Sequence, residues 1–157
     1  MFSRFILAIA LCVSVYSISI DDYGAKPNDS STEVAKANAD AFVKAIYAAN
    51  ESTTDKVVEV PFGSGKKRQE YWMLAVRVKS IKDITFKIDA EIVFPDDQSL
   101  YPVIGNDYSD LIYIQECENL HFTGKGSLEG QGYWWWIREF LGKNLHGRPH
   151  LVHIVDC

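Results

Sequence analysis

A repeat of 36 residues is the feature that most limits how this chain can fold. An offset of 36 places Val78 on Ile114, Phe86 on Phe122 and Ile92 on Leu128. A third copy begins late in the chain, where LVHIVDC (151–157) lies on LIYIQEC (111–117). Self-similarity of this length is the signature of architectures in which one structural unit stacks on the next.

Within each copy the expected strand centres fall eight residues apart, at Val76, Ile84 and Ile92 and again at positions 112, 120 and 128. That spacing is too short for strand–helix–strand units, whose crossovers need about a dozen residues or more. We therefore expect an all-β fold, a right-handed parallel β-helix, with residues 95–110 and 133–150 as projecting loops. An antiparallel sandwich shares the spacing, but the chain has no Asn-Gly or Asp-Gly hairpin pair.

One amphipathic helix is expected before the repeats. Ser30 and Glu33 have the spacing of a capping box, and the run 34–50 follows them. Its apolar residues recur at helical spacing, at Ala37, Ala41, Phe42, Ala45, Ile46 and Ala49. A stack of parallel coils needs its ends covered, so this helix is predicted to cap the N-terminal end.

Residues 1–19 have the layout of a secretory signal peptide, with Arg4, an apolar run from Phe5 to Val15, and small polar residues after it. The run is short for an uncleaved membrane anchor. We expect cleavage after Ser17 or Ser19 and a secreted protein without membrane attachment, in which residues 20–157 form the N-terminal part of a parallel β-helix domain. Asn28 and Asn50 begin N-glycosylation sequons. The formal net charge of −5 argues against nucleic-acid binding.

Three segments resemble pectin-degrading enzymes. DDYGAKPNDSSTEVAKANADAF (21–42) resembles the opening of pectin-lyase-like β-helix proteins. NLHFTGKGSLEGQGYWWW (119–136) and RPHL (148–151) are similar to glycoside hydrolase family 28, the polygalacturonases and rhamnogalacturonases. The chain departs from the family pattern at two places. Residues 27–30 (Pro-Asn-Asp-Ser) stand where the family usually has Gly-Asp-Gly, and Glu129 replaces the usual Asp before Gly130. The matching positions are Gly24, Gly124, Gly126, Gly130, Gly132, Trp134, Trp135, Arg148 and Pro149.

The resemblance implies inverting hydrolysis of α-1,4-galacturonosyl bonds, without a cofactor, by a monomer that binds a pectic or related acidic polysaccharide. The family's catalytic segments lie beyond the coil that begins at Leu151. We therefore expect a chain truncated at its C-terminal end, with no catalytic residue of its own and inactive by itself. Two alternatives stay open, a non-catalytic polysaccharide-binding β-helix and a pectin or pectate lyase-like protein that uses calcium.

Candidate site residues lie in the later segments. Trp136 and Arg148 are candidates for sugar binding, whereas Trp134 and Trp135 are expected to pack against the β-helix wall. A structural role for Arg148, bonding loop carbonyls, is the competing interpretation. His146, His150 and His153 are expected to be ordinary surface histidines, with no metal site. Glu116 and Asp156 are expected to be solvated turn residues.

Cys117 and Cys157 fall in register on the proposed coils. If those coils are adjacent, the two Cα atoms lie within reach of a disulfide. A stacked pair of free thiols is the alternative.

Overall fold

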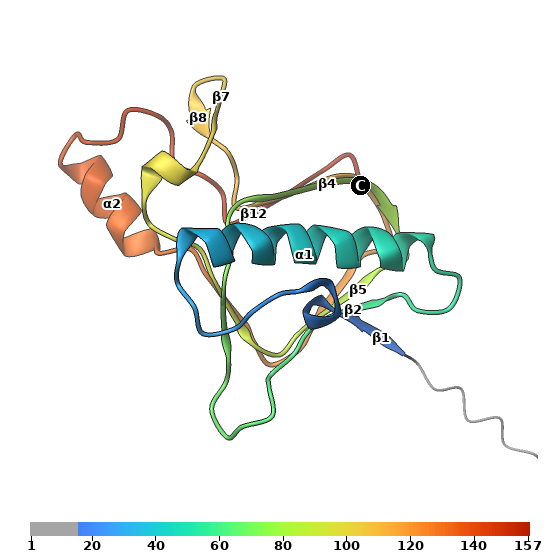
Figure 1. Ribbon diagram of the computed structural model, residues 1–157. Helices are drawn as coiled ribbons and strands as arrows, with labels where there is room; N and C mark the ends of the chain where they lie inside the picture. Colours follow the sequence, from blue (N-terminus) through green and yellow to red (C-terminus); the bar gives the residue numbers. More distant parts are fainter. Residues whose placement is uncertain (1–15) are drawn as a thin grey trace, which may run out of the picture.

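A computed structural model describes residues 16–157, and most of the predicted signal peptide lies outside these residues. Three parallel sheets dominate the structure (Figure 1). The first contains β1 (Ser17–Ser19), β2 (Val57–Val60), β5 (Thr85–Ile88) and β10 (His121–Thr123). The second contains β11 (Ser127–Glu129), β6 (Glu91–Val93) and β3 (Glu70–Trp72), and the third contains β12 (Val152–Val155), β9 (Ile112–Glu118) and β4 (Val76–Lys82).

The strand register confirms the repeat. Val78 pairs with Ile114, Phe86 with Phe122 and Ile92 with Leu128, each across the predicted 36 residues. On the next coil, Val152 pairs with Ile112, a step of 40 residues. Consecutive copies of the repeat therefore stack strand on strand in parallel, which fits a β-helix-like fold.

The core lies between the sheets, where alternate side chains along each strand are buried. Val58, Phe86, Ile92 and Ile114 are each less than 2% exposed. Burying such side chains is the main favourable contribution to the stability of the stack. The stack continues outward to Phe122, whose ring lies on Phe86 with the centroids 4.8 Å apart.

A left-handed residue recurs at the same place on successive coils, within β4 and β9 and directly after β12. Ser80, Glu116 and Asp156 have φ values of 57°, 55° and 57° at equivalent positions of successive coils. The hydroxyl of Ser80 donates to Glu116 at 2.6 Å. Glu116 and Asp156 are both exposed, as expected, but Glu116 lies within β9 and not in a turn.

The helix α1 (Thr32–Glu51) packs against β3 and β4 and crosses the end of the stack (Figure 1). Its N-cap is Ser31, whose side chain accepts a hydrogen bond from the Val34 N–H, and not the predicted Ser30. The predicted apolar stripe is buried except for Ala37, which is exposed. The helix therefore covers one end of the core, as expected.

Two predicted loops contain secondary structure that the sequence analysis missed. Residues 95–110 include a short 3-10 helix, η2 (Gln98–Leu100), and the antiparallel hairpin of β7 (Val103–Ile104) and β8 (Asp107–Tyr108). Residues 133–150 begin with the helix α2 (Gly132–Phe140). The remaining short element is the 3-10 helix η1 (Ile20–Tyr23). Within residues 16–157, neither α-helix has the length and apolar character that crossing a membrane requires.

A disulfide joins Cys117 to Cys157, with the Cα atoms 4.5 Å apart. The half-cystines end equivalent segments of neighbouring coils, so the bond ties the β12 coil to the β9 coil. Of the two alternatives left open by the sequence, the structure contains the bonded pair.

Candidate functional site

A hollow of about 360 Å³ lies where the third sheet meets the projecting loops. Three of its residues, Arg77, Tyr113 and His153, occupy the same register position on β4, β9 and β12. Parallel stacking therefore arranges them as one column on the outer face of the sheet. The other lining residues are Ile104, Asp107, Tyr108, Ser109, Asp110, Arg148 and His150.

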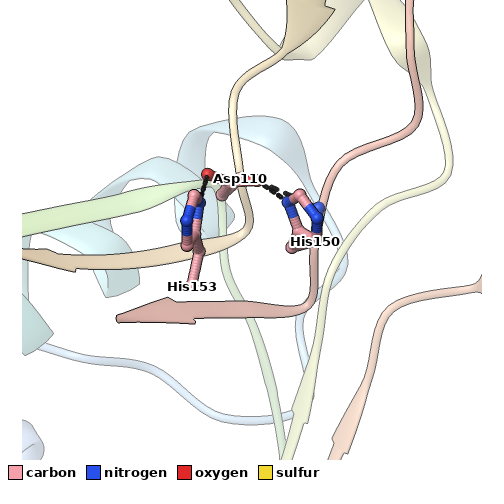
Figure 2. Close-up of side chains that lie close together, drawn as sticks. All are labelled: Asp110, His150 and His153. Atoms are coloured by element: carbon pink, nitrogen blue, oxygen red, sulfur yellow. Dashed lines mark hydrogen bonds and ion pairs between the residues drawn. The ribbon is translucent and has the colours of Figure 1, made fainter. Parts of the chain in front are cut away.

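A carboxylate lies between two imidazoles at the edge of this hollow (Figure 2). Oδ1 of Asp110 is 2.8 Å from Nδ1 of His150, and Oδ2 is 2.7 Å from Nδ1 of His153. The Asp110 side chain is only 14% exposed, whereas His150 and His153 are 70% and 38% exposed. One largely buried carboxylate thus orients two accessible rings.

The strand register explains this arrangement. Asp110 stands two residues before β9, and His150 stands two residues before β12, so they are equivalent positions on stacked coils. The backbone N–H of His150 also donates to Oδ1 of Asp110 at 3.0 Å. His153 joins them because it points outward from the second position of β12.

The two imidazoles influence the ionisation of Asp110. Burial by itself raises the pKa of this carboxyl group, because it disfavours the charged form. Hydrogen bonds from the His153 side chain and from the backbone and side chain of His150 outweigh burial, and the pKa is lowered overall. Asp110 is therefore an anion at neutral pH.

Two arginines lie over aromatic rings beside the cluster. The guanidinium carbon of Arg77 is 4.0 Å from the centre of the Tyr113 ring, and that of Arg148 is 3.9 Å from the Trp136 ring. A cation over an aromatic face is attracted by the negative potential of the ring. Both guanidinium groups are therefore held by a planar contact that leaves their edges available for hydrogen bonds.

The structure brings the two predicted sugar-binding residues together. Trp136 is 61% exposed and carries Arg148 on its face. Trp135 is buried as predicted, at 4% exposure, against Tyr101 and Tyr108. The prediction for Trp134 was wrong, since it is 48% exposed and lies against Tyr133. Three consecutive tryptophans on a helix point in three directions about 100° apart, so one of them packs inward while its two neighbours face solvent.

The histidines also differ from the prediction. His146 packs edge-on against Tyr108, with ring centroids 5.1 Å apart, and stays outside the carboxylate cluster. His150 and His153 are not independent surface residues, because they share Asp110. The missed signal is one residue before the aligned segments 111–117 and 151–157, where the same 40-residue offset pairs Asp110 with His150. In the described part of the chain, Asp110, His150 and His153 form a group whose ligand atoms lie within 4.8 Å of one another.

Several predicted motif positions serve the scaffold. A side chain at Gly124 or Gly126 would overlap the backbone of Ile88 or Ala90 on the coil below, so the two glycines allow close coil stacking. Gly24 has φ +93° at the end of η1. Gly130 and Pro149 lie, with Trp136 and Arg148, around a second hollow of about 300 Å³ next to the first.

The two sequon asparagines have different environments. Asn28 is exposed, and its Oδ1 accepts the Glu70 N–H at 3.2 Å. Asn50 lies in the last turn of α1 and binds the backbone of β4, accepting from Lys82 at 2.9 Å and donating to Ser80 at 3.3 Å. Asn50 therefore joins the capping helix to the first coil.

Comparison with known proteins gives one informative match. A curated protein named polygalacturonase, from Malus domestica, is 29% identical over 122 residues, which are 76% of this chain. The aligned region is 23% of that protein, so the chain spans about a quarter of the relative's length. No family model matches the chain. These findings support a polygalacturonase-like relationship.

Proposed function

We propose that this chain forms the N-terminal coils of a secreted, polygalacturonase-like glycoside hydrolase with a right-handed parallel β-helix fold. The function proposed for these coils is to bind an acidic pectic polysaccharide. The stacked parallel strands and the polygalacturonase relative support the proposal. Crossovers between parallel strands are almost always right-handed, which supports the handedness.

The observation that carries the binding proposal is the pair of ring-stacked arginines. A guanidinium group that lies on an aromatic ring keeps its N–H donors in its own plane, where they form a fork that fits a carboxylate. Arg77 and Arg148 both line the same hollow. Galacturonic acid residues carry a carboxylate on every sugar ring, so a chain of them offers two such groups to the two forks.

We propose that the present residues bind and do not cleave. Inverting glycosidases need a carboxyl group that stays protonated as the general acid, and a second carboxylate about 6.5–9.5 Å away. The pKa values of Asp29, Glu59, Asp97 and Asp110 are all lowered, each by hydrogen bonds to the charged form that outweigh the opposing effect of burial. None of these four groups has the property of a general acid. The inverting hydrolysis of α-1,4-galacturonosyl bonds is proposed for a whole enzyme of this kind, and the aligned region is 23% of the polygalacturonase relative.

Calorimetric titration with oligogalacturonate tests the binding proposal. The wild-type chain should bind it, and a neutral galactan oligosaccharide of equal length should give no heat. Arg148→Ala should weaken binding at least tenfold, whereas Lys125→Ala, which removes the same charge from the corner between β10 and β11, should not. Equal affinity for the neutral oligosaccharide, or full affinity in Arg148→Ala, would sink the proposal. Release of reducing ends above that of a boiled control would contradict the non-catalytic role.

Export is part of the proposal. A disulfide is typical of proteins in oxidising compartments. Of the two predicted cleavage points, the bond after Ser17 leaves Ile18 in β1, where it packs on the core and pairs with Val58. N-terminal sequencing of protein from the culture medium should therefore begin at Ile18. A chain retained in the cell with an intact N-terminus would contradict export.

A further inference from the structure

We propose that Asp110, His150 and His153 form a binding site for a divalent transition-metal ion, with zinc as the representative ion. The inference is independent of polysaccharide binding, because it rests on the ligand atoms alone. Two imidazole nitrogens and one carboxylate, open to solvent on one side, form a three-ligand set that zinc sites use with a fourth position for water.

The distances are close to those that a metal requires. The Nδ1 atoms of His150 and His153 lie 2.8 and 2.7 Å from the two Asp110 oxygens. A tetrahedral ion with bonds of about 2.0–2.1 Å holds neighbouring ligand atoms roughly 3.3 Å apart. Each imidazole therefore has to move about half an ångström away from its own carboxylate oxygen, and one ligand atom from each of the three residues already lies within 4.8 Å of the other two.

The different exposure of the three side chains suits that adjustment. Asp110 is the fixed member, because it is 14% exposed and its Oδ1 also accepts the backbone N–H of His150. The His150 ring is 70% exposed, so it can shift at little cost. A fixed carboxylate with adjustable imidazoles allows the site to close around an ion without moving a strand.

The charged residues that line the hollow are compatible with a bound metal cation. Arg77 and Arg148 line the same hollow and keep their positive charges over the aromatic rings, so a metal ion needs nearby carboxylates to offset them. The carboxylate of Asp107 lines the hollow as well and adds a second negative charge. The cluster therefore offers an anionic ligand with another acidic group close by.

The donor set also selects the type of metal. Imidazole nitrogen suits zinc, copper, nickel and iron, whereas calcium and magnesium take oxygen ligands almost entirely. With two nitrogens among three donors, the cluster should prefer zinc over calcium by a wide margin. The residues come from neighbouring coils and the disulfide ties those coils together, so an ion here would add a second cross-link next to Cys117–Cys157.

Zinc titration of the tag-free chain, stripped of metal with a chelator, tests the site by calorimetry. The expected result is one saturable zinc site per chain and no heat with calcium. Asp110→Asn and His153→Ala should each weaken zinc binding at least tenfold, since even partners that only orient a metal ligand contribute 10–100-fold. The matched control is His146→Ala, which removes an imidazole from the same loop but outside the cluster, and it should retain the wild-type affinity.

A measurement on the unmodified chain guards against variants that fail to fold. Nitrogen-15 spectra of the histidine rings should show zinc-induced shifts at His150 and His153, with His121 and His146 unchanged. Absence of saturable zinc uptake, uptake undiminished in His153→Ala, or shifts confined to other histidines would each overturn the proposal.

Discussion

Asp110 lies on the coil below His150, which follows it by 40 residues in the chain. The Asp110 carboxylate accepts the backbone N–H of His150 at 3.0 Å and is 2.8 Å from Nδ1 of the His150 imidazole. The same carboxylate meets His153 through its other oxygen. Two coils are thus joined by polar contacts at the place where the projecting loops return to the sheet. This connection aligns the aromatic and basic residues that line the hollow, and the following predictions test the scaffold that holds it.

Gly126 should tolerate no side chain. A Cβ atom there would overlap the backbone oxygen of Ala90 on the coil below, and backbone cannot move aside easily. We expect Gly126→Ala to destabilise the protein by about 1–3 kcal/mol or more, measured by thermal or urea unfolding. Gly132→Ala is the matched control, because nothing lies within 4 Å of its added carbon. Equal stability of the two variants would contradict close stacking at this corner.

Trp135 should contribute far more to stability than Trp134. Trp135 is buried against Tyr101 and Tyr108, so Trp135→Ala removes a large core side chain and should cost about 3–5 kcal/mol. Trp134 is exposed and touches Tyr133, so Trp134→Ala should change the unfolding free energy by about 0.5 kcal/mol or less. Chemical denaturation of both variants measures the difference. The reverse order would mean that α2 faces the opposite way.

The disulfide should stabilise the β12 coil. It closes a loop with a sequence separation of 40 residues, for which the chain-entropy model gives about 4 kcal/mol at 25 °C. The double variant Cys117→Ala, Cys157→Ala should therefore melt at a lower temperature than wild type in oxidising buffer. In reducing buffer the wild type should fall to the melting temperature of the variant. An unchanged wild-type transition after confirmed reduction would contradict this prediction.

Glu59 should contribute a pH-dependent part of the stability. The hydrogen bond from Lys87 is the largest effect that lowers the pKa of Glu59 in the folded state, and it opposes burial, which raises that pKa; Ser17 adds a second hydrogen bond only in a chain that keeps this residue. A lowered folded-state pKa adds stability above the unfolded pKa, about 4.3 for Glu, and that stability is lost as the pH falls through the folded pKa.

The difference in unfolding free energy between wild type and Glu59→Gln tests this contribution. It should be constant, at about 1 kcal/mol or less, from pH 5.5 to 7 and shrink steadily below about pH 4. Unfolding curves at a series of pH values measure it. A difference that grows toward acid would have the wrong sign.

Much of the fold could be predicted because its cause is local and periodic. Val78, Phe86 and Ile92 each find an apolar partner 36 residues on, and parallel stacking follows from that match. The helix α1 was predictable for a similar reason, since one apolar stripe and a serine cap mark it. Its first turn was placed one residue early, because Ser30 and Ser31 compete for the cap and the turn at Asp29 leaves Ser31 in position.

The site was less predictable because its contacts cross between coils. Arg148 and Trp136 were both identified, but the stacking of one on the other depends on α2, whose bulky aromatic run resembles a loop insertion. The Asp110 cluster was missed although the 40-residue offset was visible, because Asp110 and His150 are unlike residues that stand just before the two aligned segments. Side chains that meet across coils leave no pattern within either segment.

The most direct test of the account is a titration of isotope-labelled protein with trigalacturonate, followed through the four tryptophan indole N–H signals. Single substitutions assign each signal. The Trp136 signal should shift saturably, while those of Trp72, Trp134 and Trp135 should stay in place, and a neutral trisaccharide should cause no shift. A Trp136 signal that does not shift at saturating trigalacturonate, or that shifts equally with the neutral sugar, would contradict binding of the acidic sugar beside Trp136.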